Sequence, residues 1–408
     1  MKQKNKGAIY GMDIGTIYTQ WATNRYFDEE TRKELETIAD NNSEIRDRFY
    51  KELNFGTAGI RGIIGAGTNR MNKYVVRRLS TAIAAHILSK GTKAKKDGIV
   101  IGYDSRNFSE EFAKEAAAVF AGNGIKVYLH TEIIPVPVLS FSVRHLRCAA
   151  GVMITASHNP KEYNGYKVYG PDGAQLSLTD SAQISRIMLS ITDYTKVPSF
   201  SFDFFKTGNN IKYVDSNIKS IYLKEVKKLI ADKEGFKKNA GKITVVYTPL
   251  HGAGAKWIPE ILKECGVTNL HTVKEQMQPD GNFPTVNLPN PEDPAAFTMA
   301  LDLAKNIQAD IVLASDPDSD RTGVYARTPN GDYAMLNGNQ IGVLLLERII
   351  ESHNMRKMMP VNPFVVSTVV STRLTKQICE TNNIEYIDVL TGFKFIGEKI
   401  MELDDRGD

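Results

Sequence analysis

The pattern of apolar and polar positions changes twice in the first hundred residues. Residues 27–53 are rich in charge and carry apolar residues at helical spacing, which predicts one or two surface helices. Five glycines between positions 56 and 67 then interrupt that pattern. Residues 73–90 again have the amphipathic spacing of a helix, and Gly91 follows as a stop signal. We therefore expect a glycine-rich loop between two helical segments.

From residue 98 the chain alternates between short apolar runs and amphipathic segments. The run GIVIGYDSR predicts a strand with a charged end, and SEEFAKEAAAVFAGNG predicts a helix with Ser109 as its N-cap. Two more strands are expected at IKVYLH and at GVMITASHNP. Strands that alternate with helices are typical of parallel α/β layering.

The same alternation starts again near residue 242 and near residue 363. We therefore predict tandem related α/β domains with mixed, mostly parallel sheets. The expected parts are a helical extension at 1–44, a first domain at 45–235, a second at 236–345 and a partial third at 346–408. Connectors near 194–217 and 275–297 are rich in turn-forming residues and are not expected to be strands throughout.

Composition limits the class of protein. The 408 residues are 42% hydrophobic and 24% charged, which is typical of a globular chain. A net charge of +4 is too small to indicate a nucleic-acid partner. The chain has no run of about 18 apolar residues, so we expect no membrane partner. The basic start MKQKNK lacks the apolar stretch of a signal peptide, and Cys148, Cys265 and Cys379 lack metal-ligand spacing. These features favour a cytoplasmic protein and indicate no particular oligomeric state.

The run ASDPDSDR places three acids at alternating positions after an apolar strand. Asp316, Asp318 and Asp320 would repel one another unless they shared a cation. Carboxylate oxygens are hard ligands, so this cluster predicts magnesium, manganese or calcium rather than zinc.

Three other interpretations of this cluster compete with a metal site. An EF-hand would need glycine and glutamate where this chain has Arg321 and Arg327. A phosphatase of the haloacid-dehalogenase type would use the first aspartate as nucleophile, but its motif has Thr or Val at the position of Asp320. A solvated acidic turn does not usually follow so apolar a strand. Magnesium commonly completes its shell with phosphate oxygens, and Arg321 can bind a further phosphate.

Ser157 and His158 follow the apolar strand of GVMITASHNP. A strand, a turn and a helix cap would explain them without chemistry. A serine–histidine pair would suggest a hydrolase, but neighbouring residues on an extended chain point in opposite directions, so we expect His158 to be poorly placed to accept a proton from Ser157. The surrounding residues also lack the G-x-S-x-G pattern. A phosphorylated Ser157 would supply the oxygens that the carboxylate cluster lacks.

Five motifs in this order resemble the α-D-phosphohexomutases, the superfamily of phosphoglucomutases and phosphomannomutases. They are FGTAGIRG, GYDSR, TASHNP, DPDSDR and TGFK. The resemblance extends from about residue 45 to the C-terminus. SHNPKEYNGYKVYG, FPTVNLPNPED and GNQIGVLLL look most like the bacterial phosphoglucomutase and phosphopentomutase branch.

The resemblance implies a mechanism. Phosphorylated Ser157 would transfer its phosphoryl group to a sugar monophosphate through a bisphosphate, with glucose 1,6-bisphosphate as intermediate and activator. Asp316, Asp318, Asp320 and the serine phosphate would bind Mg²⁺. Lys167 matches the general acid/base, although a solvated strand lysine is the simpler interpretation. Arg61 matches its electrostatic partner.

Further residues take supporting roles in the resemblance. Arg106, His158 and Asn159 would support the serine loop, although ordinary structural hydrogen bonds would also explain them. Thr391, Gly392 and Lys394 of TGFK would contact the sugar phosphate, together with Arg321. The loop TPLHGAG around His251 is expected to be structural, and His251 is left out of the site.

The family's later sugar-binding loop and its fourth domain have no counterpart in these 408 residues. We therefore expect phosphoglucomutase activity that is weak or lost, with an exposed sheet edge and apolar surface in the third unit. A phosphopentomutase or phosphomannomutase is the alternative within the class. A magnesium-dependent phosphohydrolase and a non-catalytic relative are alternatives outside it.

Overall fold

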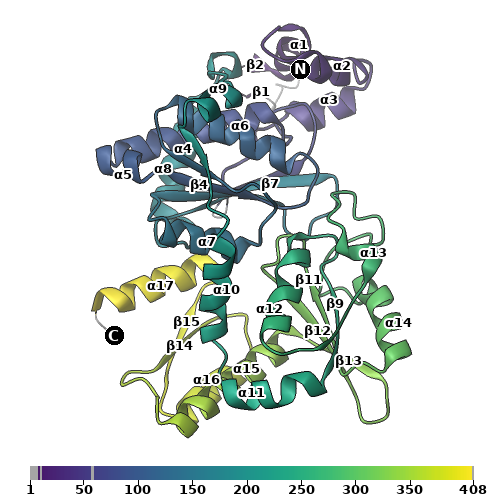
Figure 1. The fold of residues 1–408 in the computed structure, drawn as a ribbon. Coiled ribbons are helices and arrows are strands. Elements are labelled where there is room, and N and C mark those ends of the chain that lie inside the picture. The colour runs from purple at the N-terminus through teal and green to yellow at the C-terminus, as the bar shows by residue number, and fades with distance from the viewer. Residues whose placement is uncertain (1–7, 10–11, 57–58, 407–408) are drawn as a thin grey trace, which may run out of the picture. The chain divides into compact units, whose positions relative to one another are not determined.

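The computed structural model describes residues 8–9, 12–56 and 59–406 of the chain, coloured by residue number in Figure 1. The chain forms two compact units, residues 1–214 and 215–408. The predictions for MKQKNK and for part of FGTAGIRG fall outside the described residues, which omit 1–7, 10–11, 57–58 and 407–408. The predicted domain limits at residues 44, 235 and 345 stay predictions.

The first unit is an α/β unit built around one six-stranded sheet. Its helices are α1 (Ile14–Thr23), α2 (Glu29–Glu36), α3 (Asn42–Phe49), α4 (Lys73–Ser89), α5 (Thr92–Asp97), α6 (Ser109–Gly122), α7 (Val136–His145), α8 (Leu178–Ser190) and α9 (Phe202–Thr207). Its strands are β3 (Gly59–Ile63), β4 (Ile99–Tyr103), β5 (Val127–Leu129), β6 (Ala150–Ile154), β7 (Tyr163–Tyr169) and β8 (Ile211–Tyr213), with a separate short ribbon of β1 (Ala8–Ile9) and β2 (Met12–Asp13).

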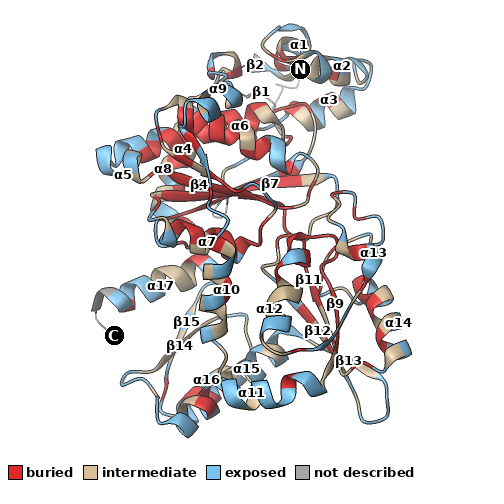
Figure 2. Cartoon of the chain, in the orientation of Figure 1, coloured by how far each residue is buried: buried red, intermediate tan, exposed pale blue. Residues whose placement is uncertain are grey.

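The strand order of this sheet is β3-β7-β6-β4-β5-β8. The strands β6, β4, β5 and β8 run parallel, whereas β7 is antiparallel to both of its neighbours. Figure 1 shows α4 and α6 on one face of the sheet and α7 on the other. Every residue of β4 and β6 is buried, which explains their continuous apolar sequences, and Figure 2 shows this buried layer at the centre of the unit.

The charge-rich segment before the sheet forms α2 and α3, as its spacing predicts. Asp28 and Asn41 cap these helices by accepting hydrogen bonds from main-chain N–H groups. Trp21 on α1 is almost fully buried against a ring of aromatic side chains that includes Phe49 and Tyr194. The predicted helix at 73–90 is α4. The predicted N-cap at Ser109 is wrong, because Ser109 is the first helical residue and its hydroxyl binds Asp104 instead.

Two side chains of these helices hold the glycine-rich loop after β3. Arg48 on α3 donates from Nη1 to the carbonyl oxygen of Ala66 at 3.1 Å, and Glu34 on α2 accepts from the Ala66 N–H. Gly67 has a φ of 134°, and a side chain there would meet the carbonyl of Arg48. The loop thus uses glycine where the chain passes close to α3.

The second unit contains two sheets. Its helices are α10 (Ile218–Lys228), α11 (Lys233–Asn239), α12 (Ile258–Glu264), α13 (Lys274–Met277), α14 (Thr298–Ile307), α15 (Gly338–Arg356), α16 (Leu374–Thr381) and α17 (Phe393–Arg406). Its strands are β9 (Thr244–Thr248), β10 (Asn269–Thr272), β11 (Ile311–Ser315), β12 (Thr322–Arg327), β13 (Tyr333–Leu336), β14 (Phe364–Thr368) and β15 (Glu385–Val389).

The larger sheet has the order β10-β9-β11-β12-β13. The strands β10, β9 and β11 are parallel, and β12 and β13 add an antiparallel hairpin at one edge. The core beside this sheet includes Val246, Phe297 and Val312, which have no exposed surface. Mixed sheets in both units confirm the predicted fold class, and the parallel strands lie where the chain alternates between strand and helix.

The smaller sheet consists of β14 and β15, which pair in parallel. Large apolar side chains nearby are exposed, among them Leu345 on α15 and Phe393 on α17, which are 59% and 72% exposed. The predicted apolar surface of the third unit is thus present in the part of the chain that the structure describes, and the exposed sheet edge stays a prediction. None of the described helices combines the length and apolar character that crossing a membrane requires.

Candidate nucleophile loop and metal centre

Ser157 lies three residues beyond the carboxyl end of β6, in a tight turn. Its φ is 53°, which is in the left-handed region that residues with a side chain rarely adopt, and its exposed fraction is 3%. Such a conformation costs free energy and persists where the surrounding contacts enforce it. The contacts around the turn therefore hold Ser157 in one conformation just beyond the end of a buried parallel strand.

Hydrogen bonds with Thr155 and Asp104 stabilise this turn. The Ser157 N–H donates to Oγ1 of Thr155 at 2.8 Å, and that hydroxyl donates to Oδ2 of Asp104 at 2.7 Å. Oδ1 of Asp104 accepts from the main-chain N–H of Arg106 and from Ser109. Asp104 is 1% exposed, and sequence reasoning did not select it or Thr155. The sequence signal that could have indicated Asp104 is its position in GYDSR, directly after an apolar strand.

Arg106 binds the loop from the side through its guanidinium group. It donates to the carbonyl oxygens of Ser157 at 2.6 Å, Pro160 at 2.9 Å and Tyr163 at 3.0 Å, and also to that of Asn159. The planar group with several donors suits four acceptors that face it together. The structure thus brings Arg106 to the serine loop, as the motif GYDSR suggested.

His158 is closer to Ser157 than we expected. Its Nδ1 lies 3.3 Å from Oγ of Ser157, within hydrogen-bonding distance. The expectation that these side chains point apart is wrong, because it assumed extended backbone, whereas the left-handed φ of Ser157 turns the chain. His158 can therefore exchange a hydrogen bond with the serine hydroxyl directly.

Lys167 lies on β7 and is only 7% exposed, so the interpretation as a solvated strand lysine is wrong. In the antiparallel pairing of β3 with β7, Gly59 lies opposite Lys167 and Gly165 opposite Arg61. Arg61 and Lys167 are therefore diagonal neighbours on one face, with only glycines as their direct partners. Arg61 Nη1 donates to Oδ1 of Asn159 at 2.6 Å, which connects β3 to the serine loop.

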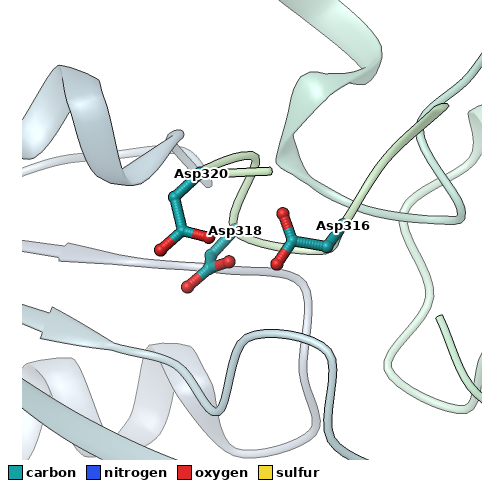
Figure 3. Close-up of side chains that lie close together, drawn as sticks. All are labelled: Asp316, Asp318 and Asp320. Carbon is teal, nitrogen blue, oxygen red and sulfur yellow. The ribbon is translucent and has the colours of Figure 1, made fainter. Parts of the chain in front are cut away.

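Three carboxylates meet in the second unit, directly after β11. One oxygen from each of Asp316, Asp318 and Asp320 lies within 4.8 Å of the others, and Figure 3 shows the three groups turned toward one another. Asp316 and Asp318 have no exposed surface. Burying acids so close together is unfavourable unless a cation balances their charge. The donor set of carboxylate oxygens fits a hard divalent ion such as magnesium.

The loop TPLHGAG packs beneath the carboxylate loop. A Cβ at Gly252 would lie 2.4 Å from Cα of Pro317, so only glycine allows this approach, and the Ala253 N–H donates to the carbonyl of Pro317 at 2.8 Å. Tyr247 and Ser315 share a 2.7 Å hydrogen bond beneath the same loop, and burial, together with the nearby charge of Asp316, raises the pKa of Tyr247.

His251 belongs to this supporting layer. Its two ring nitrogens contact the carbonyl oxygen of Gln278 and the hydroxyl of Thr285, at 3.0 Å and 2.9 Å. The side chain is 2% exposed. The expectation that TPLHGAG is structural agrees with these contacts.

Arg321 follows the carboxylates and is more exposed than they are. Its main-chain N–H donates to Oδ1 of Asp316 at 3.1 Å. Its guanidinium group lies 3.3 Å from Glu292 and 3.9 Å from Asp320. The side chain is therefore near the carboxylate cluster, and a phosphate group would have to compete with Glu292 for it.

The TGFK segment joins β15 to α17. Gly392 has a φ of 131°, and Thr391 before it is exposed, whereas Lys394 in the first turn of the helix is 4% exposed. Burial lowers the pKa of Lys394, although the charge of Glu398 opposes that shift. The Lys394 ammonium lies 4.4 Å from the centre of the Phe395 ring.

Each unit thus assembles one part of the predicted site. The first unit brings together Ser157, Lys167, Arg61, Arg106, His158 and Asn159. The second unit brings Arg321 to Asp316, Asp318 and Asp320, and it places Thr391, Gly392 and Lys394 beside the smaller sheet. The chain therefore belongs to a class of proteins built from consecutive α/β/α domains. In this class, polar loops follow the carboxyl ends of parallel strands.

Comparison with known proteins specifies that class. Family models of phosphoglucomutase/phosphomannomutase α/β/α domains I, II and III match residues 52–195, 220–331 and 337–405. The chain belongs to the phosphoglucomutase/phosphomannomutase family. It is 40% identical over 367 residues to the phosphoglucomutase of Staphylococcus aureus strain USA300, covering 89% of this chain and 63% of the relative. The chain thus spans less than two thirds of the length of the curated relatives it matches.

Solved structures agree on the fold. A protein from Thermus thermophilus, described as a phosphomannomutase candidate, is 26% identical with a TM-score of 0.68 and covers 87% of this chain and 72% of its own. Parafusin from Paramecium, an exocytosis-sensitive phosphoprotein described as a phosphoglucomutase, is 19% identical with a TM-score of 0.66, over 88% of this chain and 65% of its own.

Proposed function

We propose that this chain is a magnesium-dependent phosphosugar mutase that interconverts α-D-glucose 1-phosphate and glucose 6-phosphate. The observation that carries the proposal is the cluster of three carboxylates, two of them without exposed surface, after a strand of a phosphoglucomutase-family domain. The 40% identity to a phosphoglucomutase supports glucose phosphates as substrates. A phosphopentomutase or phosphomannomutase stays the alternative within the class.

Ser157 would carry the phosphoryl group. In the forward step the bond between phosphorus and Oγ of Ser157 breaks, and a bond from phosphorus to a sugar hydroxyl oxygen forms, which produces glucose 1,6-bisphosphate. The return step moves the other phosphoryl group of this bisphosphate to Ser157. The left-handed turn and its contacts with Arg106 would hold Oγ in one position through both steps.

Lys167 and Arg61 would serve the sugar hydroxyl. Lys167 Nζ would accept the proton that the attacking hydroxyl loses and return it in the reverse step. Arg61 keeps its charge, so it would stabilise negative charge on the moving phosphoryl group while its contact with Asn159 keeps it beside the loop. His158 would support the serine through the contact between Nδ1 and Oγ.

Asp316, Asp318 and Asp320, together with the phosphate of Ser157, would hold the magnesium ion. The ion would neutralise charge on the transferring phosphoryl group when bound. Thr391, Gly392, Lys394 and Arg321 would bind the sugar phosphate. A cytoplasmic location stays a prediction, and the proposed partner is a small sugar phosphate.

Phosphorylation by glucose 1,6-bisphosphate tests the proposal. We expect the chain, incubated with this compound and Mg²⁺, to gain one phosphoryl group on the peptide that contains Ser157. This half-reaction tests Ser157 directly, because it requires one phosphoryl transfer and not the second transfer that completes the mutase reaction. Ser157→Ala should abolish the label, and the control Ser190→Ala, an exposed serine at the end of α8, should retain it.

The alternatives predict other outcomes. Phosphate attached to Asp316 or Asp318, released by hydroxylamine, would support a phosphohydrolase and contradict the mutase. No label at any residue would support a non-catalytic relative. Comparing the rates of phosphorylation with the bisphosphates of glucose, mannose and ribose would identify the sugar.

A further inference from the structure

A cavity of about 550 Å³ lies at the edge of the first unit's sheet that is opposite to Ser157. Ser157 follows the carboxyl end of β6, whereas this cavity lies where the parallel strands β4, β5 and β8 begin. Its lining consists of lysines, glycines, asparagines and one threonine. The mutase proposal uses none of these residues.

Four lysines from three segments line the cavity. Lys95 and Lys96 lie on α5 just before β4, Lys126 directly precedes β5, and Lys212 lies within β8. Backbone pairing fixes two of these positions, since the carbonyl of Lys126 accepts from the Ile99 N–H at 2.8 Å and Lys212 pairs with Tyr128. The sheet thus places two of the lysines, and α5 places the other two.

The cavity carries no compensating negative charge. No aspartate or glutamate lines it, and within the described ranges none of the four lysines forms an ion pair. The neighbouring lysines behave differently, since Lys93 pairs with Asp97 at 2.6 Å and Lys90 with Asp180 at 3.2 Å. Gathering four positive charges without a counter-charge favours an anion in the cavity.

Local contacts position two of the lysines. A Cβ at Gly124 would lie 2.8 Å from Nζ of Lys95, and the φ of Gly124 is 72°. Lys126 Nζ lies 4.5 Å from the centre of the Tyr128 ring, and Tyr128 pairs with Lys212 across the strands. A larger residue at position 124 would displace the ammonium group of Lys95.

We propose that this cavity binds a small molecule that carries two or more phosphate groups. Lysine ammonium groups bind phosphate oxygens as point charges, and four of them match the charge of a diphosphate or triphosphate better than that of a single phosphate. The volume lies within the range of small-molecule sites. The proposal does not depend on the mutase activity.

Titration with inorganic triphosphate tests the proposal. We expect the chain to bind triphosphate more tightly than inorganic phosphate in isothermal titration calorimetry. Lys126→Gln together with Lys212→Gln should weaken that binding by about tenfold for each lysine removed. Lys93→Gln is the matched control, because Lys93 lies on the same helix but is paired and lies outside the cavity, and its affinity should equal that of the parent.

Hydrogen exchange locates the bound ligand separately from the Ser157 region. Triphosphate should protect amides in residues 92–98 and 206–213 of the parent and not of the double variant. Protection confined to other segments, or an equal loss of affinity in Lys93→Gln, would overturn the proposal. Unchanged melting temperatures without ligand would show that the double variant folds.

Binding to vesicles that contain phosphatidylserine distinguishes a soluble ligand from a lipid headgroup. We expect sedimentation with such vesicles to be the same for the parent and the double variant. Vesicle binding that requires Lys126 and Lys212, without a matching change in triphosphate affinity, would contradict a soluble phosphorylated ligand.

Discussion

The carbonyl oxygen of Ser157 accepts a 2.6 Å hydrogen bond from Nη2 of Arg106, a residue 51 positions earlier in the chain. The same guanidinium group binds three further carbonyl oxygens of the loop. One side chain from the loop after β4 therefore sets the shape of the loop after β6. This relationship connects the folding of the first unit with the position of its proposed nucleophile.

Arg106→Lys should slow the phosphorylation of Ser157 by glucose 1,6-bisphosphate. Lysine keeps the charge but cannot bridge four carbonyl groups, and a displacement of about 1 Å can cost about a hundredfold in rate. Rapid-quench labelling of the Ser157 peptide measures this rate. Arg144→Lys, on the exposed surface of α7, serves as control, and equal rates for both variants would contradict a positioning role for Arg106.

Asp318→Asn should have opposite effects on the protein with and without metal. Without metal it removes a buried negative charge that lies beside two other carboxylates, so the unfolding free energy should rise by about 1 kcal/mol or more. With Mg²⁺ the variant should bind at least about tenfold more weakly, because an amide is a poorer ligand than a carboxylate. Calorimetric titration and thermal melts with and without Mg²⁺ measure both effects. A variant that is less stable without metal and binds Mg²⁺ normally would indicate a purely structural acidic turn.

Gly252→Ala should disturb the carboxylate loop without touching an acid. The new methyl group would meet Cα of Pro317 at 2.4 Å, and overpacking of this kind typically costs about 1–3 kcal/mol. We therefore expect a lower melting temperature and weaker Mg²⁺ binding. Gly342→Ala is a matched control on α15, where a Cβ has no neighbour within 4 Å, and it should stabilise the helix by about 0.5–1 kcal/mol. Equal effects of the two substitutions would argue against the close packing of TPLHGAG.

His130 should make the first unit sensitive to acid. Burial lowers the pKa of His130 from 6.5 to about 3, and its Nε2 lies 3.2 Å from the hydroxyl of Ser142. At pH values between these two pKa values, the unfolded chain binds a proton that the folded chain does not. The free energy of unfolding therefore falls as the pH falls, by up to about 1.4 kcal/mol per pH unit.

His130→Gln should flatten this dependence between pH 6.5 and 5. Trp21 lies in the first unit and Trp257 in the second, so denaturation followed by fluorescence in a Trp257→Phe background reports the first unit. The exposed His145, replaced by Gln, is the control and should keep the slope of the parent. A slope unchanged by His130→Gln would show that His130 is protonated in the folded chain or that other groups dominate.

Local patterns predicted most of the fold, whereas the roles of the site residues stay predictions. The apolar run of β6 is continuous because the strand is buried on both faces, and the run of β11 is mostly apolar although one of its faces is only partly buried. The polar loops after them drew attention to Ser157 and to the three aspartates. The error at Ser109 was local as well, because the N-cap was inferred from residue type alone.

The sequence by itself determined the alternation of strands and helices and the spacing of Asp316, Asp318 and Asp320, because both depend on residues close together in the chain. Only the tertiary structure decided that Lys167 is buried, because that follows from the position of β7 between β3 and β6. It likewise decided that Ser157 adopts a left-handed turn beside His158. That conformation is held by Arg106, which donates to the Ser157 carbonyl, and by Asp104, which accepts from Thr155. Both residues are distant from Ser157 in the chain, and no local pattern encodes contacts between distant residues.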